Sequence, residues 1–220
     1  MKNPFSLSRR LALCASYVAQ DSRLADIGTD HAYLPIALCL DNKILSAVAC
    51  DIAQGPLGRA KENILRYELA DKIETRLSDG LQNVKKDEID TVVIAGMGGE
   101  LIAKILSECP YIKDKSLSLI LQPMTRCEKL ILWLYENGFA IQHQSAVTED
   151  GKHYTVMLVR YTGEVKTPSP LSLYLGKLSK EHDEENAFLE HTLNRLKKQA
   201  IGDDLARIAA RQLEEYLYEN

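Results

Sequence analysis

The sequence predicts an α/β fold: a mostly parallel, doubly wound sheet that ends in an antiparallel hairpin, followed by a C-terminal helical region. Three observations support this prediction. Short apolar segments alternate with turns and with apolar residues at helical spacing, which is typical of parallel strands joined by helices. Two extended segments flank Asp150 and Gly151, which favour a hairpin turn. Beyond residue 170, leucines recur at helical spacing without a further strand.

The stretch LADIGTDHAYLPI, residues 24–36, predicts the first strand, a tight turn and a helix. The apolar residues before the turn suit a buried parallel strand, and Gly28 suits a turn that needs positive φ or a close approach to a ligand. We expect Asp30 to cap the helix that follows. A ligand would then lie at the carboxyl end of this strand, where doubly wound sheets bind cofactors.

An amphipathic helix over residues 7–19 precedes that strand and could form a lid over the cofactor site. The other predicted strands are 46–51, 73–79, 91–95 and 117–121, and the hairpin joins 139–148 to 153–161. The other predicted helices are 56–67, one from residue 101, 126–137, and two within 171–199 and 203–218, with Gly202 between them and Asp203 or Asp204 as a cap.

The composition is that of one globular domain with an extension. The chain has 220 residues and a formal net charge of -4, which argues against nonspecific coating of nucleic acid but allows a local basic face. Its five cysteines form no CxxC pair and no zinc spacing, so we expect free thiols, a cytoplasmic protein and no metal site. No apolar run approaches the roughly 18 residues of a membrane span, so we expect no membrane partner.

The turn after the first strand argues against a dinucleotide. Its sequence, GTDHAY, has Asp30 where the second glycine of GxGxxG would stand, and that carboxylate would repel a pyrophosphate. A ligand with a cationic reacting group and a nucleoside end, but no phosphate, tolerates such an acid, and S-adenosylmethionine is one. Asp51 ends the second strand roughly 20 residues after Gly28, which is the spacing of an acid that binds both ribose hydroxyls. Asp79, after the third strand, is placed to bind the adenine amino group.

Acids at the ends of three successive strands favour the interpretation that they bind this cofactor. The alternative is that they are solvated charges in surface loops. An Asp-x-Gly turn alone would be a weak signal, because it occurs in many α/β domains. The expected cofactor-binding residues are Asp26, Gly28, Thr29, Asp51, Ile52, Asp79, Gly80, Ala95 and Gly96.

The glycine-rich segment 96–99 (GMGG) ends the fourth predicted strand, where a methyl acceptor would enter. Glycines permit a base to approach the backbone closely, and the carbonyls of Ala95 and Gly96 could orient its exocyclic amine. Taken alone, the segment is better explained as a structural turn before a helix, and a histidine at a helix start is more often a capping or packing residue. The expected substrate contacts are Arg9, His31, Tyr33, Met97 and Gln122.

Together, the segments LADIGTDHAYLPI, ACDI, LSDGL, IAGMGGELI and LQPM resemble the bacterial TrmK family, which methylates N1 of adenine 22 in tRNA, and the resemblance covers nearly the whole chain. It implies a Rossmann-like class I methyltransferase domain followed by a C-terminal helical hairpin, or coiled-coil-like domain. Two prolines and small polar residues in the segment 163–170 (GEVKTPSP) indicate a linker, so we expect the domains to be 1–163 and 164–220. The resemblance also implies S-adenosylmethionine as cofactor and tRNA as partner, with no obligate protein partner evident. No Asn-Pro-Pro-Tyr element follows the fourth strand, so base handling is not carried over from amino-group methyltransferases.

Adenine N1 carries a lone pair in the neutral base, so methyl transfer to it needs positioning more than a strong base. The product is cationic until a proton leaves the exocyclic amine. We hypothesise that Asp30 is the catalytic residue that stabilises this charge or takes the proton. Three alternatives stay open: a nicotinamide-dependent oxidoreductase, a methyltransferase of another RNA or a small molecule, and a non-catalytic RNA-binding protein with a methyltransferase shell.

Overall fold

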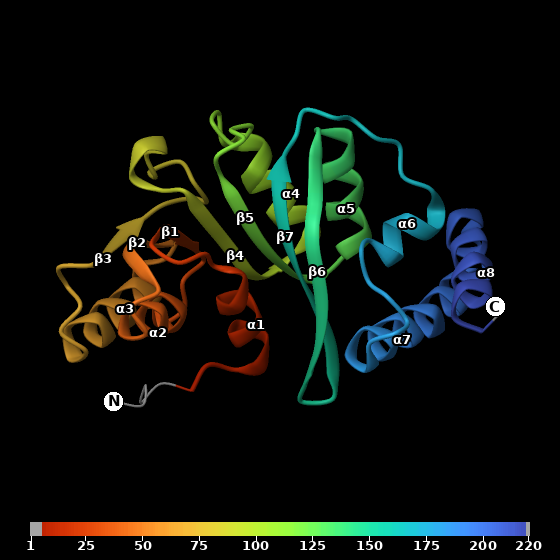
Figure 1. Ribbon diagram of the computed structural model, residues 1–220, viewed down its shortest axis with the longest axis horizontal. Helices are drawn as coiled ribbons and strands as arrows, with labels where there is room; N and C mark the ends of the chain where they lie inside the picture. Colours follow the sequence, from red (N-terminus) through yellow and green to blue (C-terminus); the bar gives the residue numbers. More distant parts are fainter. Residues whose placement is uncertain (1–5, 219–220) are drawn as a thin grey trace.

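The computed structural model describes residues 6–218, which form one seven-stranded sheet flanked by helices (Figure 1). The strands are β1 (Ser22–Ile27), β2 (Ile44–Asp51), β3 (Ile73–Leu77), β4 (Thr91–Gly98), β5 (Ser118–Thr125), β6 (Phe139–Glu149) and β7 (Lys152–Tyr161). The helices are α1 (Arg9–Tyr17), α2 (Tyr33–Leu40), α3 (Gln54–Arg66), α4 (Gly99–Glu108), α5 (Cys127–Glu136), α6 (Pro170–Leu175), α7 (Asp183–Gln199) and α8 (Asp204–Tyr218), with a short 3-10 helix, η1 (Lys86–Glu88). The predicted α/β fold with its hairpin and C-terminal helices is confirmed.

The strand order across the sheet is β3-β2-β1-β4-β5-β7-β6. Strands β1 to β5 run parallel, whereas β7 is antiparallel to both β5 and β6. The chain passes from β3 at one edge back across to β4, so the strand order reverses between β1 and β4. Open α/β sheets bind their ligands beyond the carboxyl ends of the strands at such a reversal.

Helices cover both faces of the sheet (Figure 1). Helices α1, α2 and α3 pack against one face, and α4 and α5 pack against the other. Successive strand residues point to opposite faces, so Leu24 of β1 contacts the first group of helices while Ala25 and Ile27 contact the second. Because both faces are buried, the central strands are nearly continuous apolar runs.

Helix α1 lies against the hairpin side of the sheet. Ser8 caps it by accepting a hydrogen bond from the N–H of Leu11 at 3.4 Å. Its buried face, centred on Cys14, packs toward β5, β6 and β7. The backbone N–H of Arg10 donates to the carboxylate of Glu149 at the hairpin turn, at 2.8 Å. The first turn of α1 is therefore held close to the carboxyl edge of the sheet.

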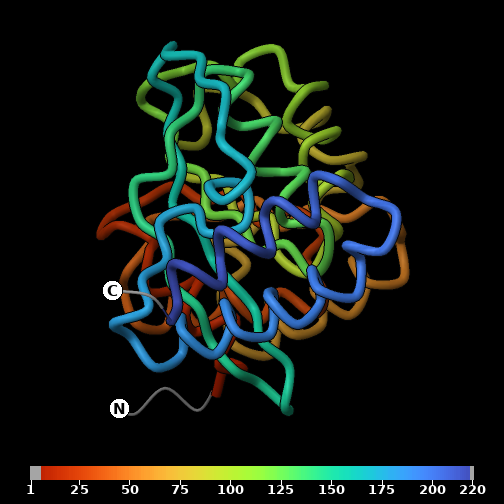
Figure 2. Tube along the Cα trace, turned by 90° about the vertical axis from the view of Figure 1, so that its right-hand side faces the viewer, coloured from red at the N-terminus to blue at the C-terminus, as the bar shows by residue number. Residues whose placement is uncertain are grey.

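The C-terminal helices form a separate apolar cluster on the hairpin. The buried cluster consists of leucines and alanines of α7 and α8 together with Leu178, which precedes α7, and Ala146 of β6. Figure 2 shows α7 and α8, in blue, side by side across one face of the molecule. Asp203 caps α8 as predicted, because its Oδ1 accepts the N–H of Ala206 at 3.0 Å. The division of the chain into 1–163 and 164–220 stays a prediction.

The predicted cap of α2 is wrong. The helix begins at Tyr33, three residues after Asp30, and no side chain caps it. His31 and Ala32 intervene in left-handed backbone, with φ of 61° and 55°. The carboxylate of Asp30 is therefore not used as a cap, and its side chain is 71% exposed.

The predicted helix within 171–199 is interrupted between α6 and α7. Gly176 follows α6 with φ of +58°, and a Cβ there would lie 2.2 Å from Oε1 of Gln144 on β6. The same Oε1 accepts the N–H of Lys177 at 2.8 Å. The glycine thus lets the chain dock on the hairpin before α7 begins, which the spacing of leucines could not reveal.

Strands β4 and β5 run further than the predicted 91–95 and 117–121. Their pairing continues past Ala95, and Gly96, with φ of +81°, is left without a partner in the ladder. The segment predicted as a turn is therefore a bulged end of β4. Bulges of this kind re-aim residues next to binding sites.

Gly99→Ala should destabilise the fold, because a Cβ at Gly99 would lie 2.3 Å from the carbonyl oxygen of Arg126. Overpacking of this kind costs about 1–3 kcal/mol of unfolding free energy. Gly58→Ala is the matched control: nothing lies within 4 Å of a Cβ at that position, so it should stabilise α3 by roughly 0.5–1 kcal/mol. Urea unfolding measures both variants, and equal effects would contradict this account of the α4–α5 contact.

Candidate active site

A cavity of about 420 Å³ opens at the carboxyl ends of β1 and β4, where the strand order reverses. This volume lies within the roughly 300–1,000 Å³ of small-molecule sites. Helix α1 and the hairpin border it, which fits the predicted covering role of that helix. Its lining residues are Ser8, Arg10, Leu11, Asp26, Gly28, Asp30, Tyr33, Leu34, Ala95, Gly96 and Glu149.

Asp26, at the end of β1, is a buried carboxyl group in the wall of this cavity. It is 7% exposed, and its Oδ2 accepts a hydrogen bond from the hydroxyl of Thr29 at 2.6 Å. Burial raises the pKa of Asp26 from 3.8 to about 6; the Thr29 hydroxyl opposes this shift, and the carboxylate of Asp51 adds to it. A carboxylate held in a cavity against its desolvation penalty indicates a cationic ligand.

The turn after β1 is bonded to the end of β2. The N–H groups of Gly28 and Thr29 both donate to the carbonyl oxygen of Cys50, at 2.9 and 2.8 Å. Gly28 has φ of +74°, and a Cβ there would lie 2.1 Å from Cε of Met97. Met97, expected to contact substrate, packs over Gly28. Because Gly28 has no side chain, it can adopt the turn conformation and leave room for Met97.

Two further predicted acids, Asp51 and Asp79, lie along the same edge of the sheet, at the ends of β2 and after β3. Asp51 is partly buried, and its Oδ1 accepts the backbone N–H two residues later at 2.8 Å, which fixes the carboxylate at the end of β2. Ile52 beside it is 68% exposed. Strand β3 ends at Leu77 rather than at Asp79, which is exposed in the following loop, whereas Gly80 is buried.

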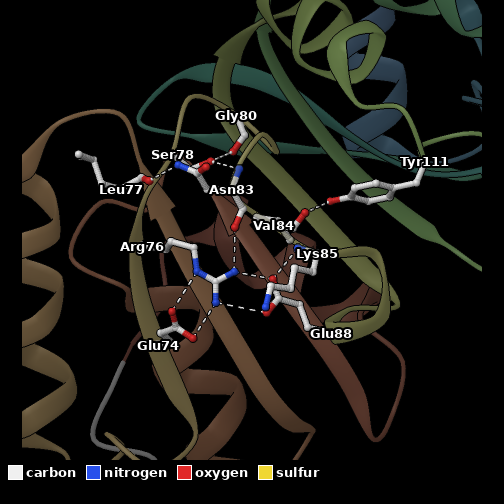
Figure 3. Close-up of polar contacts among 10 residues, drawn as sticks. All are labelled: Glu74, Arg76, Leu77, Ser78, Gly80, Asn83, Val84, Lys85, Glu88 and Tyr111. Atoms are coloured by element: carbon white, nitrogen blue, oxygen red, sulfur yellow. Dashed lines mark hydrogen bonds and ion pairs between the residues drawn. The ribbon is translucent and has the colours of Figure 1, made fainter.

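Arg76 holds the loop that carries Asp79 (Figure 3). Its guanidinium donates to the carboxylate of Glu88 and, at 2.9 Å, to the carbonyl oxygen of Asn83. The hydroxyl of Ser78 accepts the N–H of Asn83 at 3.1 Å and closes the loop from the other side. Charge-assisted bonds across the loop therefore set the position of Asp79.

Gln122 of β5 joins the bulge of β4 to α1. Its Oε1 accepts the N–H of Gly96 at 2.9 Å and Nη1–H of Arg10 at 2.8 Å. Its Nε2 donates to the carbonyl oxygen of Pro123 at 3.0 Å, and the residue is fully buried. Gln122 was expected to contact substrate. Both the oxygen and the nitrogen of its side-chain amide are hydrogen-bonded within the protein, so it positions the β4 bulge and the guanidinium of Arg10.

Arg10 lines the cavity, where the sequence had indicated Arg9. Nε of Arg10 lies 3.8 Å from Oε1 of Glu149, and the guanidinium lies over the ring of Tyr154, 5.7 Å from its centroid. Arg9 instead pairs with Glu184 on α7, at 2.6 Å. The sequence did not indicate Arg10 or Glu149. Arg9 and Arg10 are adjacent, so the sequence gave no basis for deciding which of them faces the cavity, and Glu149 lies 139 positions after Arg10.

Asp30, His31 and Tyr33 form one rim of the cavity. Asp30 and Tyr33 belong to its lining. Oδ1 of Asp30 lies 3.3 Å from Nε2 of His31 and 3.5 Å from Nη2 of Arg59. The rings of His31 and Tyr33 stack with centroids 5.0 Å apart. These three predicted residues are thus brought together, although the cap that was expected of Asp30 is absent.

The arrangement fits S-adenosylmethionine. Asp26 offers an anion to a charged ligand, Asp51 offers a fixed carboxylate to a ribose diol, and Gly28 leaves the backbone of the turn without a Cβ. Within residues 6–218, no group of three or more histidine, cysteine and acidic side chains could hold a metal ion. No helix in that range is both long enough and apolar enough to cross a membrane.

Comparison with known proteins identifies the family. A model of the methyltransferase domain family matches residues 7–157. A Bacillus subtilis tRNA (adenine(22)-N(1))-methyltransferase is 38% identical over 179 residues, which are 80% of this chain and 74% of the relative. The chain belongs to the TrmK family of methyltransferases.

Solved structures agree with this assignment. A candidate tRNA (m1A22) methyltransferase from Streptococcus pneumoniae, in complex with S-adenosyl-L-methionine, is 34% identical with a TM-score of 0.85, covering 97% of this chain and 100% of that one. TrmK from M. capricolum, in complex with S-adenosyl-homocysteine, is 30% identical with a TM-score of 0.80, covering 96% of this chain and 97% of that one. The predicted family and fold class are confirmed, and the roles of single residues stay predictions.

Asp26→Asn should remove a pH dependence of stability. Because the pKa of Asp26 is raised from 3.8 to about 6, the native state binds this proton more tightly than the unfolded state does, so the group favours folding increasingly as pH falls from about 6 to 4. Above pH 6, burial of the ionised carboxylate costs up to about 3 kcal/mol, since one pKa unit is about 1.4 kcal/mol.

Asparagine does not ionise, so the variant should be up to about 3 kcal/mol more stable than the wild type at pH 8 and nearly equal to it at pH 4. Urea unfolding at both pH values measures the difference. A difference in unfolding free energy between the two proteins that stays constant with pH would show that the ionised carboxylate of Asp26 is not its source.

Proposed function

We propose that this protein transfers a methyl group from S-adenosylmethionine to N1 of adenine 22 in tRNA. The observation that carries the proposal is the cavity with a buried acid at the reversal of strand order, in a chain 38% identical to a tRNA (adenine(22)-N(1))-methyltransferase. Family members of the same fold have been solved with S-adenosyl-L-methionine and with S-adenosyl-homocysteine, the cofactor and its product.

The residues at the carboxyl edge would each hold one part of the cofactor. Asp26 would bind its cationic end beside the Gly28 turn, Asp51 would accept hydrogen bonds from both ribose hydroxyls, and Asp79 would accept one from the adenine amino group. When bound, S-adenosylmethionine supplies an electrophilic methyl group on a sulfonium. Because strand ends and the Arg76 network fix these carboxylates, binding needs little reorganisation of the protein.

The acceptor adenine would enter at the bulge of β4. Ala95 and Gly96 form the cavity wall there, and their carbonyls could orient the exocyclic amine while N1 faces the methyl group. Gln122 and Arg10 hold this wall in place, since Oε1 of Gln122 accepts hydrogen bonds from both Gly96 and Arg10. Because N1 is engaged in Watson-Crick pairing within a duplex, the target adenine must be unpaired or extruded.

Asp30 would act on the product side of the reaction. Its carboxylate lies on the rim of the cavity, is not used to cap α2, and is near the cationic group of Arg59 rather than buried. It would stabilise the positive charge of the methylated base or accept the proton from its exocyclic amine, directly or through water.

We further propose that the enzyme acts in the cytoplasm. The five cysteines are free thiols, four of them buried, which suits a reducing compartment that also contains tRNA. Residues 1–163 would carry the chemistry, and residues 164–220 would extend the surface that meets tRNA.

Asp51→Asn should weaken cofactor binding, because a neutral amide loses the charge-assisted bonds to the ribose diol. A loss of roughly 1.5–3 kcal/mol corresponds to an increase in Kd of about 10- to 100-fold. Asp71→Asn, in the exposed turn before β3, makes the same chemical change at the opposite edge of the sheet and should leave Kd unchanged. Calorimetric titration with S-adenosylmethionine measures both variants, and equal affinities would remove Asp51 from the site.

Transfer of labelled methyl to unmodified tRNA, followed by nuclease mapping, tests the function itself. The wild type and the Asp71→Asn control should label N1 of adenine 22, and Asp51→Asn should label it slowly at limiting cofactor. Cofactor binding without any label in tRNA would overturn the substrate, and label at a different nucleotide would overturn the position.

Asp30→Asn should lower kcat roughly 100-fold, at the low end of general acid–base contributions. The cofactor Kd should stay near the wild-type value, because Asp30 lies on the exposed rim. Glu62→Gln, on the exposed side of α3, neutralises a nearby acid as the control. Steady-state methyl transfer at saturating substrates measures kcat for both variants, and a wild-type kcat in Asp30→Asn would remove Asp30 from the mechanism.

A further inference from the structure

A second cavity, of about 100 Å³, lies between the end of β5, the start of α5, strand β7 and helix α7. Four basic side chains line it, namely Arg126, His153, His191 and Arg195, and no carboxylate belongs to its lining. These residues come from three separate elements, so the fold alone brings them together. Three threonines, Thr125, Thr155 and Thr192, also line it.

This cavity adjoins the active site through β5 and β7. Gln122 belongs to the active site, and residues 123–125, which follow it on β5, line the second cavity. On β7, Tyr154 lies under the active-site guanidinium, whereas His153 lies beside His191, with ring centroids 5.4 Å apart. Successive strand residues point to opposite faces, so the hairpin has the active site on one face and the basic cavity on the other.

Arg195 forms an ion pair with Glu128 that leaves hydrogen-bonding capacity unused. Nη2 of Arg195 lies 3.7 Å from Oε2 of Glu128, which is longer than a hydrogen bond, and both Nε of Arg195 and that Oε2 are buried without a hydrogen-bond partner. Burial lowers the pKa of His191, and the neighbouring His153, Arg195 and Lys198 lower it further. The exposed guanidinium of Arg126, the unmet buried Nε–H of Arg195 and the N–H groups of the two imidazoles are all hydrogen-bond donors, and together they favour an anionic ligand.

We propose that this cavity binds one backbone phosphate of the RNA substrate, close to the adenine that is methylated. The proposal rests on the tRNA methyltransferase function proposed above. A volume of about 100 Å³ accommodates a phosphate group but not a nucleoside. Arg126 and Arg195 supply N–H donors that match phosphate oxygens, and the two imidazoles supply further donors. A phosphate held here would anchor the strand beside the end of β5 while its adenine enters the first cavity.

Arg126→Gln tests the site with little risk to the fold. The backbone carbonyl of Arg126, rather than its exposed side chain, accepts the N–H of Lys129 at 3.0 Å at the start of α5. Arg66→Gln is the matched control, because it removes one exposed arginine from the last turn of α3, far along the sheet from this cavity. Filter binding of tRNA in the absence of cofactor, over roughly 50–200 mM salt, gives Kd and its salt dependence.

Arg126→Gln should weaken tRNA binding about tenfold and reduce the slope of log Kd against log salt by about one, which is the effect of losing one phosphate contact. The double variant His153→Gln/His191→Gln should weaken binding in the same direction, by about threefold. Arg66→Gln should change neither quantity. For all these variants, the cofactor Kd and the kcat at saturating tRNA should match the wild type.

Unchanged Kd and slope in Arg126→Gln, with methyl transfer intact, would overturn this phosphate site and leave the proposed function standing. A reduced slope in Arg126→Gln, with no methyl transfer by the wild type, would overturn the function and retain the site. A wild type that does not bind tRNA would overturn both.

Discussion

The buried carboxyl group of Asp26 is the constraint on which the active-site edge depends. It ends a strand in the middle of the sheet, where burial raises its pKa to about 6 and the hydroxyl of Thr29 is its hydrogen-bond donor. The turn that follows is tied to β2 through Cys50, so the carboxylate, Gly28 and Asp51 keep fixed positions at adjacent strand ends. A cationic cofactor without phosphate explains why the fold keeps an acid here at a cost in stability.

The acceptor side of the cavity depends on contacts between distant parts of the chain. Gln122 links Gly96 in the bulge of β4 to Arg10 of α1, and Glu149 at the hairpin turn binds the backbone N–H of Arg10. The hairpin also anchors the C-terminal helices, through Gln144 and the apolar cluster around α7 and α8. The β6–β7 hairpin therefore supports both the cavity wall that would receive the base and the C-terminal helices that would meet tRNA.

The sequence was sufficient to predict the strands and the acids near their carboxyl ends, because these depend on local patterns, whereas the cofactor contacts of those acids stay predictions. The buried central strands are nearly continuous apolar runs. Asp26 and Asp51 lie at the carboxyl ends of β1 and β2, and Asp79 comes two residues after the end of β3. The remaining features depend on contacts across the chain. Residues distant in sequence decide three of these features: which of Arg9 and Arg10 faces the cavity, the bulge at Gly96 in β4, and the break in the helix at Gly176. The wrong cap at Asp30 arose because two left-handed residues separate it from α2.

The affinity for S-adenosylmethionine as a function of pH, compared between the wild type and Asp26→Asn, tests the central claim most directly. If the ionised carboxylate of Asp26 binds the cationic end of the cofactor, the wild-type Kd should rise by up to about tenfold per pH unit as the pH falls below 6, because protonation removes the anion. The Asp26→Asn variant should bind weakly with a Kd that does not change over the same range. A wild-type Kd that is constant between pH 5 and 8, or an Asn variant that binds as tightly as the wild type at pH 8, would contradict the account.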